Sequence, residues 1–230
     1  MCGDLSSKGN RKSYYPIGID IKDKLCIVIG GGEVAERKAL KLLEFGANVL
    51  IISPEITKRL EKLSKKGKLN YIKDRYKKEY IKEGFLIFAA TDNEEVNFKI
   101  SEDAKKLGKL INVVDKPDLC NFILPSVVKR GDFIISIFTQ GKSPMFSKVI
   151  REKLEKEFKE IYELYVDILG NLRDKIKKKI SDERKRKEIF ENLTSIDILK
   201  ILEENNIKKL KKKIKEVLIK FNLQDELNDF

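Results

Sequence analysis

Apolar and polar positions repeat with two different periods along the first half of the chain. Continuous apolar runs of four or five residues are typical of strands buried on both faces. Between them, apolar residues recur every three or four positions, as in helices packed on a sheet. This order predicts an α/β fold with a Rossmann-like, doubly wound parallel sheet. The expected elements are strand 25–29, helix 34–45, strand 48–52, helix 56–65, strand 69–72, strand 85–89, helix 94–107 and strand 110–114.

The pattern changes after residue 120. Two β-like runs, 121–126 and 133–139, flank the turn residues 129–132 and predict a hairpin. Ser143 followed by Pro144 is a good helix start, with serine as N-cap and proline in the first turn. From there the periodicity is helical almost to the end. We expect breaks near residues 170, 181–182, 194–195 and 205–206.

The turn between the first strand and the first helix is rich in glycine. Gly30, Gly32 and Ala35 follow the pattern G-x-G-x-x-A of a dinucleotide-binding turn. In that pattern the first glycine permits the tight turn, the second lets a pyrophosphate approach the backbone, and alanine lets the helix pack closely. The helix start then offers free N–H groups to phosphates. No Gly-Lys-Ser/Thr sequence ends the motif, which excludes a P-loop.

The end of the second strand is where such folds often place an acidic residue for the ribose hydroxyls. Here the chain has Ser53, Pro54 and Glu55, and Glu55 lies slightly late for that role. Lys58 and Arg59 follow closely, so the residues alone leave both NAD and NADP open.

The carboxyl ends of two further strands supply candidates for chemistry. Ala89-Ala90-Thr91-Asp92 leaves room at one strand end, and Asp115 ends the next strand at the same edge. Asp115 is a candidate catalytic base or a simple turn residue. The chain has no histidine, which excludes Ser-His-Asp and Cys-His systems and histidine-based zinc sites. We expect no metal site.

Charge and cysteine content narrow the class of protein. The net charge is +12, and residues 151–230 carry 21 basic and 18 acidic side chains, so the remaining +9 lies in residues 1–150. That excess suits an anionic ligand, although a charged surface adapted to high temperature is an equal explanation. No apolar run reaches the ~18 residues of a membrane span. Residues 1–13 are predicted to be a flexible leader, not a signal peptide. Cys2, Cys26 and Cys120 show no C-x-x-C spacing, which suits a reducing cytoplasm, with Cys26 buried in a strand.

Several of these segments together resemble one enzyme family. Residues 30–38, residues 89–92, residues 112–115 with 122–126, and residues 141–144 with 150–154 resemble the corresponding segments of precorrin-2 dehydrogenases. That family includes the N-terminal part of siroheme synthases. The segments occur in the family's order and spacing over about residues 14–160.

The resemblance implies an NAD-dependent oxidation of precorrin-2 to sirohydrochlorin by a cytoplasmic homodimer. It implies an NAD-binding domain at 1–124, a dimerisation segment at 125–154 and a helical domain at 155–230. Asp115 matches the family's active-site aspartate. Thr139 aligns with a serine that is phosphorylated in some bifunctional members, but we do not infer that control here. The expected cofactor contacts are Gly30, Gly31, Gly32, Glu33, Val34, Ser53, Pro54, Glu55 and Thr91.

Precorrin-2 carries eight carboxylates, so basic residues are expected to hold it next to an anionic cofactor. The candidates are Arg37, Lys38, Lys116 and Lys142. Three alternatives stay open. In the first, the enzyme also inserts Fe²⁺ into sirohydrochlorin, and Asp115 serves both steps. In the second, the domain is a non-catalytic nucleotide sensor. In the third, the chain binds nucleic acid. We favour the dehydrogenase alone. The helical tail has a net charge of only +3 and few aromatics, so we do not expect a nucleic-acid partner.

Overall fold

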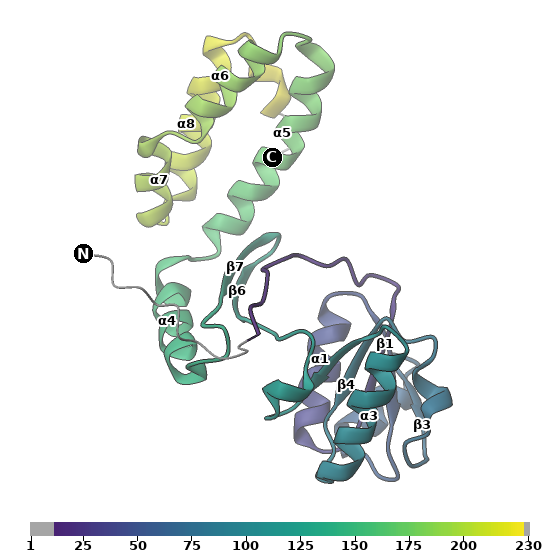
Figure 1. Ribbon diagram of the computed structural model, residues 1–230. Coiled ribbons are helices and arrows are strands. Elements are labelled where there is room, and N and C mark those ends of the chain that lie inside the picture. Colours follow the sequence, from purple (N-terminus) through teal and green to yellow (C-terminus); the bar gives the residue numbers. More distant parts are fainter. Residues whose placement is uncertain (1–11, 228–230) are drawn as a thin grey trace, which may run out of the picture. The chain divides into compact units, whose positions relative to one another are not determined.

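The computed structural model describes residues 12–227 (Figure 1). Most of the predicted leader, and with it Cys2, lies outside the described residues. The chain forms two units, residues 1–124 and residues 125–230. No helix in the described part is long and apolar enough to cross a lipid bilayer.

The first unit is built on a parallel sheet of five strands in the order β3-β2-β1-β4-β5. This confirms the predicted Rossmann-like sheet, with boundaries that differ from the expected ones by at most two residues. The strands are β1 (Leu25–Ile29), β2 (Asn48–Ile52), β3 (Asn70–Ile72), β4 (Leu86–Ala89) and β5 (Leu110–Val113). The helices are α1 (Glu33–Glu44), α2 (Lys58–Lys65), α3 (Glu94–Lys106) and the short 3₁₀ helices η1 (Lys78–Ile81) and η2 (Pro117–Leu119).

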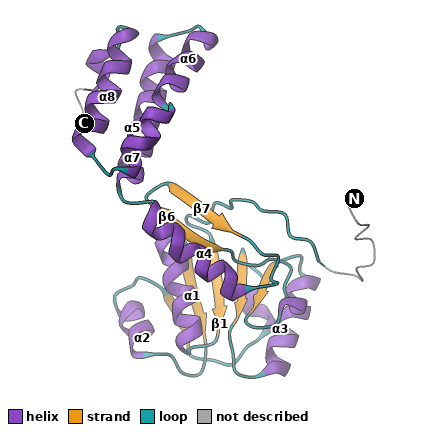
Figure 2. Cartoon of the chain, turned by 90° about the vertical axis from the view of Figure 1, so that its left-hand side faces the viewer, coloured by secondary structure: helices purple, strands orange, loops and turns teal. Residues whose placement is uncertain are grey.

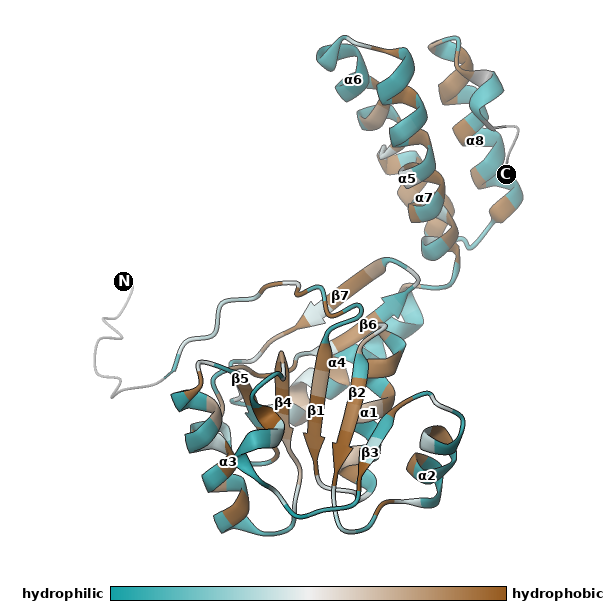
Figure 3. Ribbon diagram, turned by 90° about the vertical axis from the view of Figure 1, so that its right-hand side faces the viewer, coloured by the Kyte–Doolittle hydropathy of each residue, from teal (hydrophilic) through white to brown (hydrophobic). Residues whose placement is uncertain are grey.

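Alternate strand residues pack on opposite faces of this sheet. Val28 and Phe88 lie in one buried cluster with Ala39 of α1. Ile27 lies in the other, with Ile100 of α3. Figure 2 shows the strands between α1 and α3, and Figure 3 shows β1, β2 and β4 as predominantly hydrophobic. Burial on both faces explains why these strands are continuous apolar runs in the sequence.

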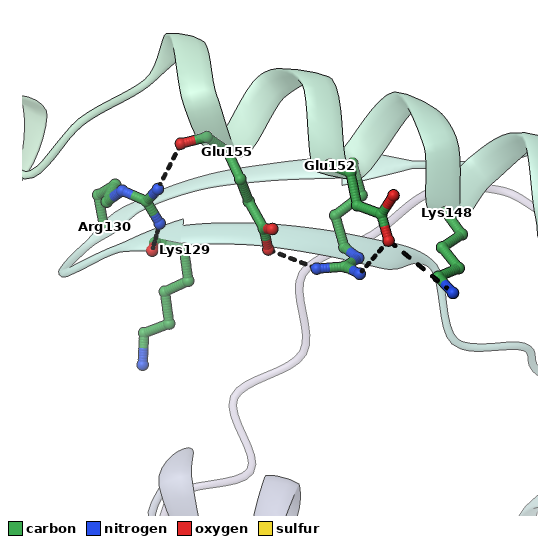
Figure 4. A network of polar contacts seen from close by, with 6 residues as sticks. Lys129, Arg130, Lys148, Glu152 and Glu155 are labelled. Carbon is green, nitrogen blue, oxygen red and sulfur yellow. Dashed lines mark hydrogen bonds and ion pairs between the residues drawn. The ribbon is translucent and has the colours of Figure 1, made fainter.

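The second unit begins with a hairpin and a helix. The antiparallel strands are β6 (Ser126–Arg130) and β7 (Phe133–Ile137), followed by α4 (Pro144–Glu157). Ser143 Oγ accepts from Phe146 N at 3.2 Å, so the predicted helix start is confirmed. A polar contact joins the hairpin to α4, because Arg130 Nη2 donates to Glu155 O at 2.8 Å (Figure 4). Within α4, Arg151 pairs with the Glu155 carboxylate at 2.5 Å.

The prediction that residues 121–126 form the first strand of the hairpin is wrong. Asn121 instead places its side-chain amide against the edge of β5, accepting from Ile111 N at 2.7 Å and donating to Lys109 O at 2.8 Å. Phe122 packs on Phe88, with ring centroids 5.6 Å apart. The apolar run therefore covers the sheet of the first unit, and the hairpin starts at Ser126.

The rest of the second unit is helical. Breaks near residues 181, 194 and 205 are confirmed. Helix α5 (Ile161–Lys179) continues through Gly170, so the break predicted there is wrong. An unpredicted break follows Glu157, where α4 ends with Phe158 as its C-cap. Ile168 and Leu172 of α5 lie in a cluster shared with the later helices, and Phe133 of β7 stacks on Tyr162 at 5.5 Å. The elements are α5 (Ile161–Lys179), α6 (Glu183–Leu193), α7 (Ile196–Glu203), α8 (Ile207–Lys220) and η3 (Gln224–Leu227).

Candidate functional site

A cleft of about 760 Å³ opens at the carboxyl edge of the parallel sheet. Its walls are the loops that follow β1, β2, β3 and β4. In open α/β sheets this edge is where ligands bind, next to the point at which the strand order reverses. The lining residues are Ile29–Gly32, Ile52–Thr57, Asp74–Tyr76, Ala90–Asn93 and Val96.

The three glycines after β1 do different things. Gly30 has φ of +121°, and a Cβ there would lie 2.1 Å from Ala90 O. A Cβ on Gly31 would lie 1.8 Å from Glu55 O. Gly32 is the N-cap of α1, so no side-chain hydrogen bond caps the first N–H groups of this helix. A Cβ on Gly32 would meet no atom within 4 Å. Gly30 and Gly31 let the loops pack, whereas Gly32 leaves open space before the free N–H groups of a helix start.

A side chain of the neighbouring strand β3 hydrogen-bonds to the loop after β2. Tyr71 OH donates to Ser53 O at 3.1 Å and to Pro54 O at 3.3 Å. Burial, and then the charge of Glu55, raises the pKa of Tyr71, so the phenol stays a donor at neutral pH. Ser53 is 8% exposed, while Glu55 is exposed in the cleft wall.

A second contact closes the loop against α1. Thr57 N donates to Gly31 O at 3.0 Å, and Thr57 Oγ1 donates to Glu36 Oε2 at 2.5 Å. Arg59 pairs with the same Glu36 carboxylate at 3.6 Å. Arg59 and Lys58, which the sequence left open as NADP contacts, are not part of the cleft lining.

The loop after β4 depends on a buried amide that the sequence analysis missed. Asn97 is 6% exposed; its Oδ1 accepts from Thr91 Oγ1 at 2.8 Å, and its Nδ2 donates to Thr91 O at 2.8 Å. Asn93 caps the same helix by accepting from Val96 N at 2.9 Å. The sequence signal for this contact was Asn97 itself, a polar residue one helical turn after the N-cap Asn93 on the side of α3 that faces the sheet.

Asp115 lies at the end of β5, outside the cleft lining. Its φ of +57° is uncommon for a residue with a side chain. The surrounding turn is fixed: Cys120 Sγ accepts from Val113 N at 3.1 Å, and Lys12 Nζ donates to Asp118 O at 2.6 Å and Cys120 O at 2.7 Å. The carboxylate of Asp115 is thus presented to solvent on a well-held turn.

The basic residues predicted to bind the substrate differ in burial and in their partners. Lys38 of α1 is half-buried, with its ammonium 5.9 Å from the centre of the Phe88 ring. Burial, and then the charge of Arg37, lowers the pKa of Lys38, while Asp115 acts in the opposite direction. Arg37 is exposed.

Lys116 pairs with Glu94 at 2.9 Å on the surface. Lys142 is exposed in the second unit. Glu33 and Val34 form the first turn of α1 and do not line the cleft. Within residues 12–227, no three side chains from Cys, Asp and Glu gather as potential metal ligands.

The fold and the cleft define a Rossmann-type nucleotide-binding protein. Comparisons with known proteins narrow this class. Residues 17–126 match a family described as "Putative NAD(P)-binding". Siroheme synthase of Ruthia magnifica is 40% identical over 183 residues, which are 80% of this chain and 39% of that protein. Siroheme synthase of Photorhabdus laumondii is 32% identical over 214 residues, 93% of this chain and 46% of that protein.

Among solved structures, one described as "SirC, precorrin-2 dehydrogenase" superposes with a TM-score of 0.73 at 23% identity, covering 89% of this chain and 98% of that one. This likeness confirms the fold over most of both units. The chain is therefore homologous to siroheme synthases over most of its own length, and residues 17–126 are similar to the family described as putatively NAD(P)-binding. It spans less than half the length of those two relatives.

Proposed function

We propose that this chain oxidises precorrin-2 to sirohydrochlorin with NAD as the hydride acceptor. The observation that carries the proposal is the open turn at Gly32, which faces the cleft in a chain homologous to siroheme synthases. The structural neighbour named precorrin-2 dehydrogenase supports the same reaction.

The residues of the cleft, together with the start of α1 next to it, fit a dinucleotide. Backbone N–H groups of Gly32, Glu33 and Val34 would hold the pyrophosphate, because α1 has no side-chain cap to satisfy them. The segment Ser53–Glu55 would hold the adenosine ribose, and Thr91 lies on the opposite wall, toward the nicotinamide half. When bound, NAD supplies the acceptor for one hydride.

We propose Asp115 as the base of this reaction. The oxidation removes two hydrogens from the macrocycle, one as a hydride to NAD and one as a proton to a base. In a chain without histidine, a strand-end carboxylate is the natural acceptor of that proton. Cys120 and Lys12 hold the turn that presents this carboxylate, so its position is set before substrate binds.

Basic residues are proposed to bind the carboxylates of the substrate. Lys38 has no ion-pair partner among the described residues, so its ammonium is available to an anionic ligand. Arg37 precedes it and is exposed. Lys116 is tied to Glu94 by an exposed ion pair, which is weak enough to exchange for a substrate carboxylate. Lys142, which belongs to the second unit, is proposed as a substrate contact from the family resemblance alone.

We also propose that the protein is a homodimer and that residues 125–154 form its contact. Apolar side chains are exposed on this segment: Met145, Phe146 and Val149 of α4 are 67%, 57% and 53% exposed, and Ile134 of β7 is 44% exposed. Exposed apolar side chains gathered on one segment favour association. Sedimentation of the wild type and of Phe146→Glu tests this, since a dimer through α4 becomes a monomer in the variant, whereas an unchanged mass contradicts the proposed contact.

A cytoplasmic location is part of the same proposal. Cys26 and Cys120 are both free thiols in the structure, and both are buried. Unpaired buried cysteines suit a reducing compartment.

The test is anaerobic incubation with precorrin-2 and NAD, following NADH and sirohydrochlorin together. We expect wild type to form both, and Asp115→Asn to be slower by roughly 10²–10⁴-fold with NAD binding retained. Asp118→Asn removes an equal charge three residues away and is the matched control. Absence of NAD-dependent oxidation by wild type contradicts the proposed function. Adding Fe²⁺, and comparing with the spontaneous rate of insertion, tests the chelatase alternative.

A further inference from the structure

The cleft wall that follows β3 carries an arginine that the proposed oxidation does not use. Asp74, Arg75 and Tyr76 all line the cleft. The Arg75 side chain is exposed, and in the described part of the chain its guanidinium has no hydrogen-bond or ion-pair partner. An arginine that lines a ligand cleft without a protein partner is available to an anionic group of the ligand.

The turn that presents Arg75 is held on both sides. The Asp74 carboxylate accepts from Lys77 Nζ at 2.6 Å, from Tyr80 OH at 2.5 Å and from Arg75 N at 2.7 Å. On the other side, Tyr76 OH donates to Asp103 Oδ2 at 3.0 Å. Both Asp74 oxygens are therefore engaged, and the carboxylate does not neutralise the Arg75 guanidinium.

The place of this turn in the sheet assigns it to one end of the ligand. Ser53 N and Asp74 N both donate to Ile72 O, at 3.2 Å and 3.0 Å, so the loops after β2 and β3 share one carbonyl. The end of β2 is where a Rossmann fold places the adenosine ribose. Arg75 follows β3 and therefore lies on the adenosine side of the sheet, with β2, β1 and β4 between β3 and β5.

We propose that Arg75 binds the 2′-phosphate of NADP, so that the cleft accepts NADP as well as NAD. This inference rests on the placement of the dinucleotide in the proposed function. The planar guanidinium matches two phosphate oxygens at once, as expected for a ribose phosphate contact. Glu55 faces the same cleft and suits the free hydroxyls of NAD, so the two side chains serve the two dinucleotides. Arg59 does not line the cleft, so Arg75 is the better placed of the two arginines for this contact.

Dissociation constants of NAD and NADP, measured by calorimetry on the full chain, test this proposal. We expect wild type to bind both. Arg75→Ala should weaken NADP binding by roughly 10-fold and NAD binding by less than about 2-fold, since only NADP loses a charge-assisted contact. Arg59→Ala removes the same charge from a residue outside the cleft and should leave the ratio of the two constants unchanged. Glu55→Gln should shift the ratio in favour of NADP.

The outcomes separate this inference from the function on which it rests. If wild type binds NAD but not NADP, or if Arg75→Ala weakens both equally, the role of Arg75 is wrong and the oxidation still stands. If wild type binds neither dinucleotide, the proposed function fails, and this inference fails with it. Steeper salt dependence for NADP than for NAD, lost in Arg75→Ala, supports the phosphate contact.

Discussion

Substitution of Gly31 and Gly32 by alanine should separate packing of the cleft from binding of its ligand. In Gly31→Ala the new Cβ would lie 1.8 Å from Glu55 O and 2.8 Å from Ser53 Oγ. The loop after β2 must then retreat by about 1.6 Å to reach ordinary contact distance. Overpacking of this kind costs ~1–3 kcal/mol, partly offset by the lower backbone entropy of alanine in the unfolded chain. We therefore expect the free energy of unfolding to fall by about 1–2 kcal/mol.

Gly32→Ala should behave in the opposite way. Its Cβ would meet no protein atom within 4 Å, so the cost is that of alanine at an N-cap, at most about 1 kcal/mol. The Cβ projects where the proposed pyrophosphate lies, so NAD affinity should fall by about 10-fold or more, as expected when a close backbone approach is blocked.

Urea unfolding and NAD titration of both variants check this, with Gly18→Ala as control because a Cβ there also meets nothing within 4 Å. The control should match wild type in both assays. The reasoning is refuted if Gly31→Ala unfolds like wild type, or if Gly32→Ala binds NAD as tightly as wild type does.

Three further predictions concern the fold. Gly170→Ala should raise the free energy of unfolding by about 0.5–1 kcal/mol, because α5 is continuous there; no gain would speak against that helix. Burial raises the pKa of Cys26 to about 11, so at pH 8 roughly one Cys26 thiol in a thousand is ionised. In a Cys2→Ser variant, alkylation of Cys26 should therefore be much faster in urea than in the native protein. Fast alkylation of Cys26 in the native protein contradicts the prediction. The hydrogen bond from Lys77 lowers the pKa of Asp74 from 3.8 to about 2. The ionised Asp74 carboxylate therefore stabilises the fold above about pH 4, and this stabilisation is lost as the pH falls through about 2. In Asp74→Asn, the free energy of unfolding should no longer fall in this pH range during an acid titration.

The parallel sheet was predictable because its physics is local in the sequence. Strands buried on both faces must be apolar throughout, as in 25–29 and 48–52. The helix starts at Thr57, Asn93 and Ser143 each use a side-chain cap, and such residues are visible as signals before a periodic run. The motif at Gly30 likewise predicted a tight turn after the first strand, and Gly30 has a positive φ there.

The parts that sequence reasoning missed depend on contacts between distant segments. Asn121 and Phe122 look like the start of a strand, yet one caps the edge of β5 and the other packs on β4. The need for glycine at position 31 arises from Glu55, which is 24 residues away. Arg75 stands in a polar turn without periodicity, so nothing local shows that it lines the cleft.

The central claim is that this chain transfers a hydride from precorrin-2 to NAD. Its most direct test is the stoichiometry of a single anaerobic turnover, with NADH and sirohydrochlorin measured in the same sample. We predict one NADH for each sirohydrochlorin formed, and no sirohydrochlorin above the spontaneous rate when NAD is omitted. Formation of sirohydrochlorin at the same rate without NAD, or no formation with it, would contradict the claim.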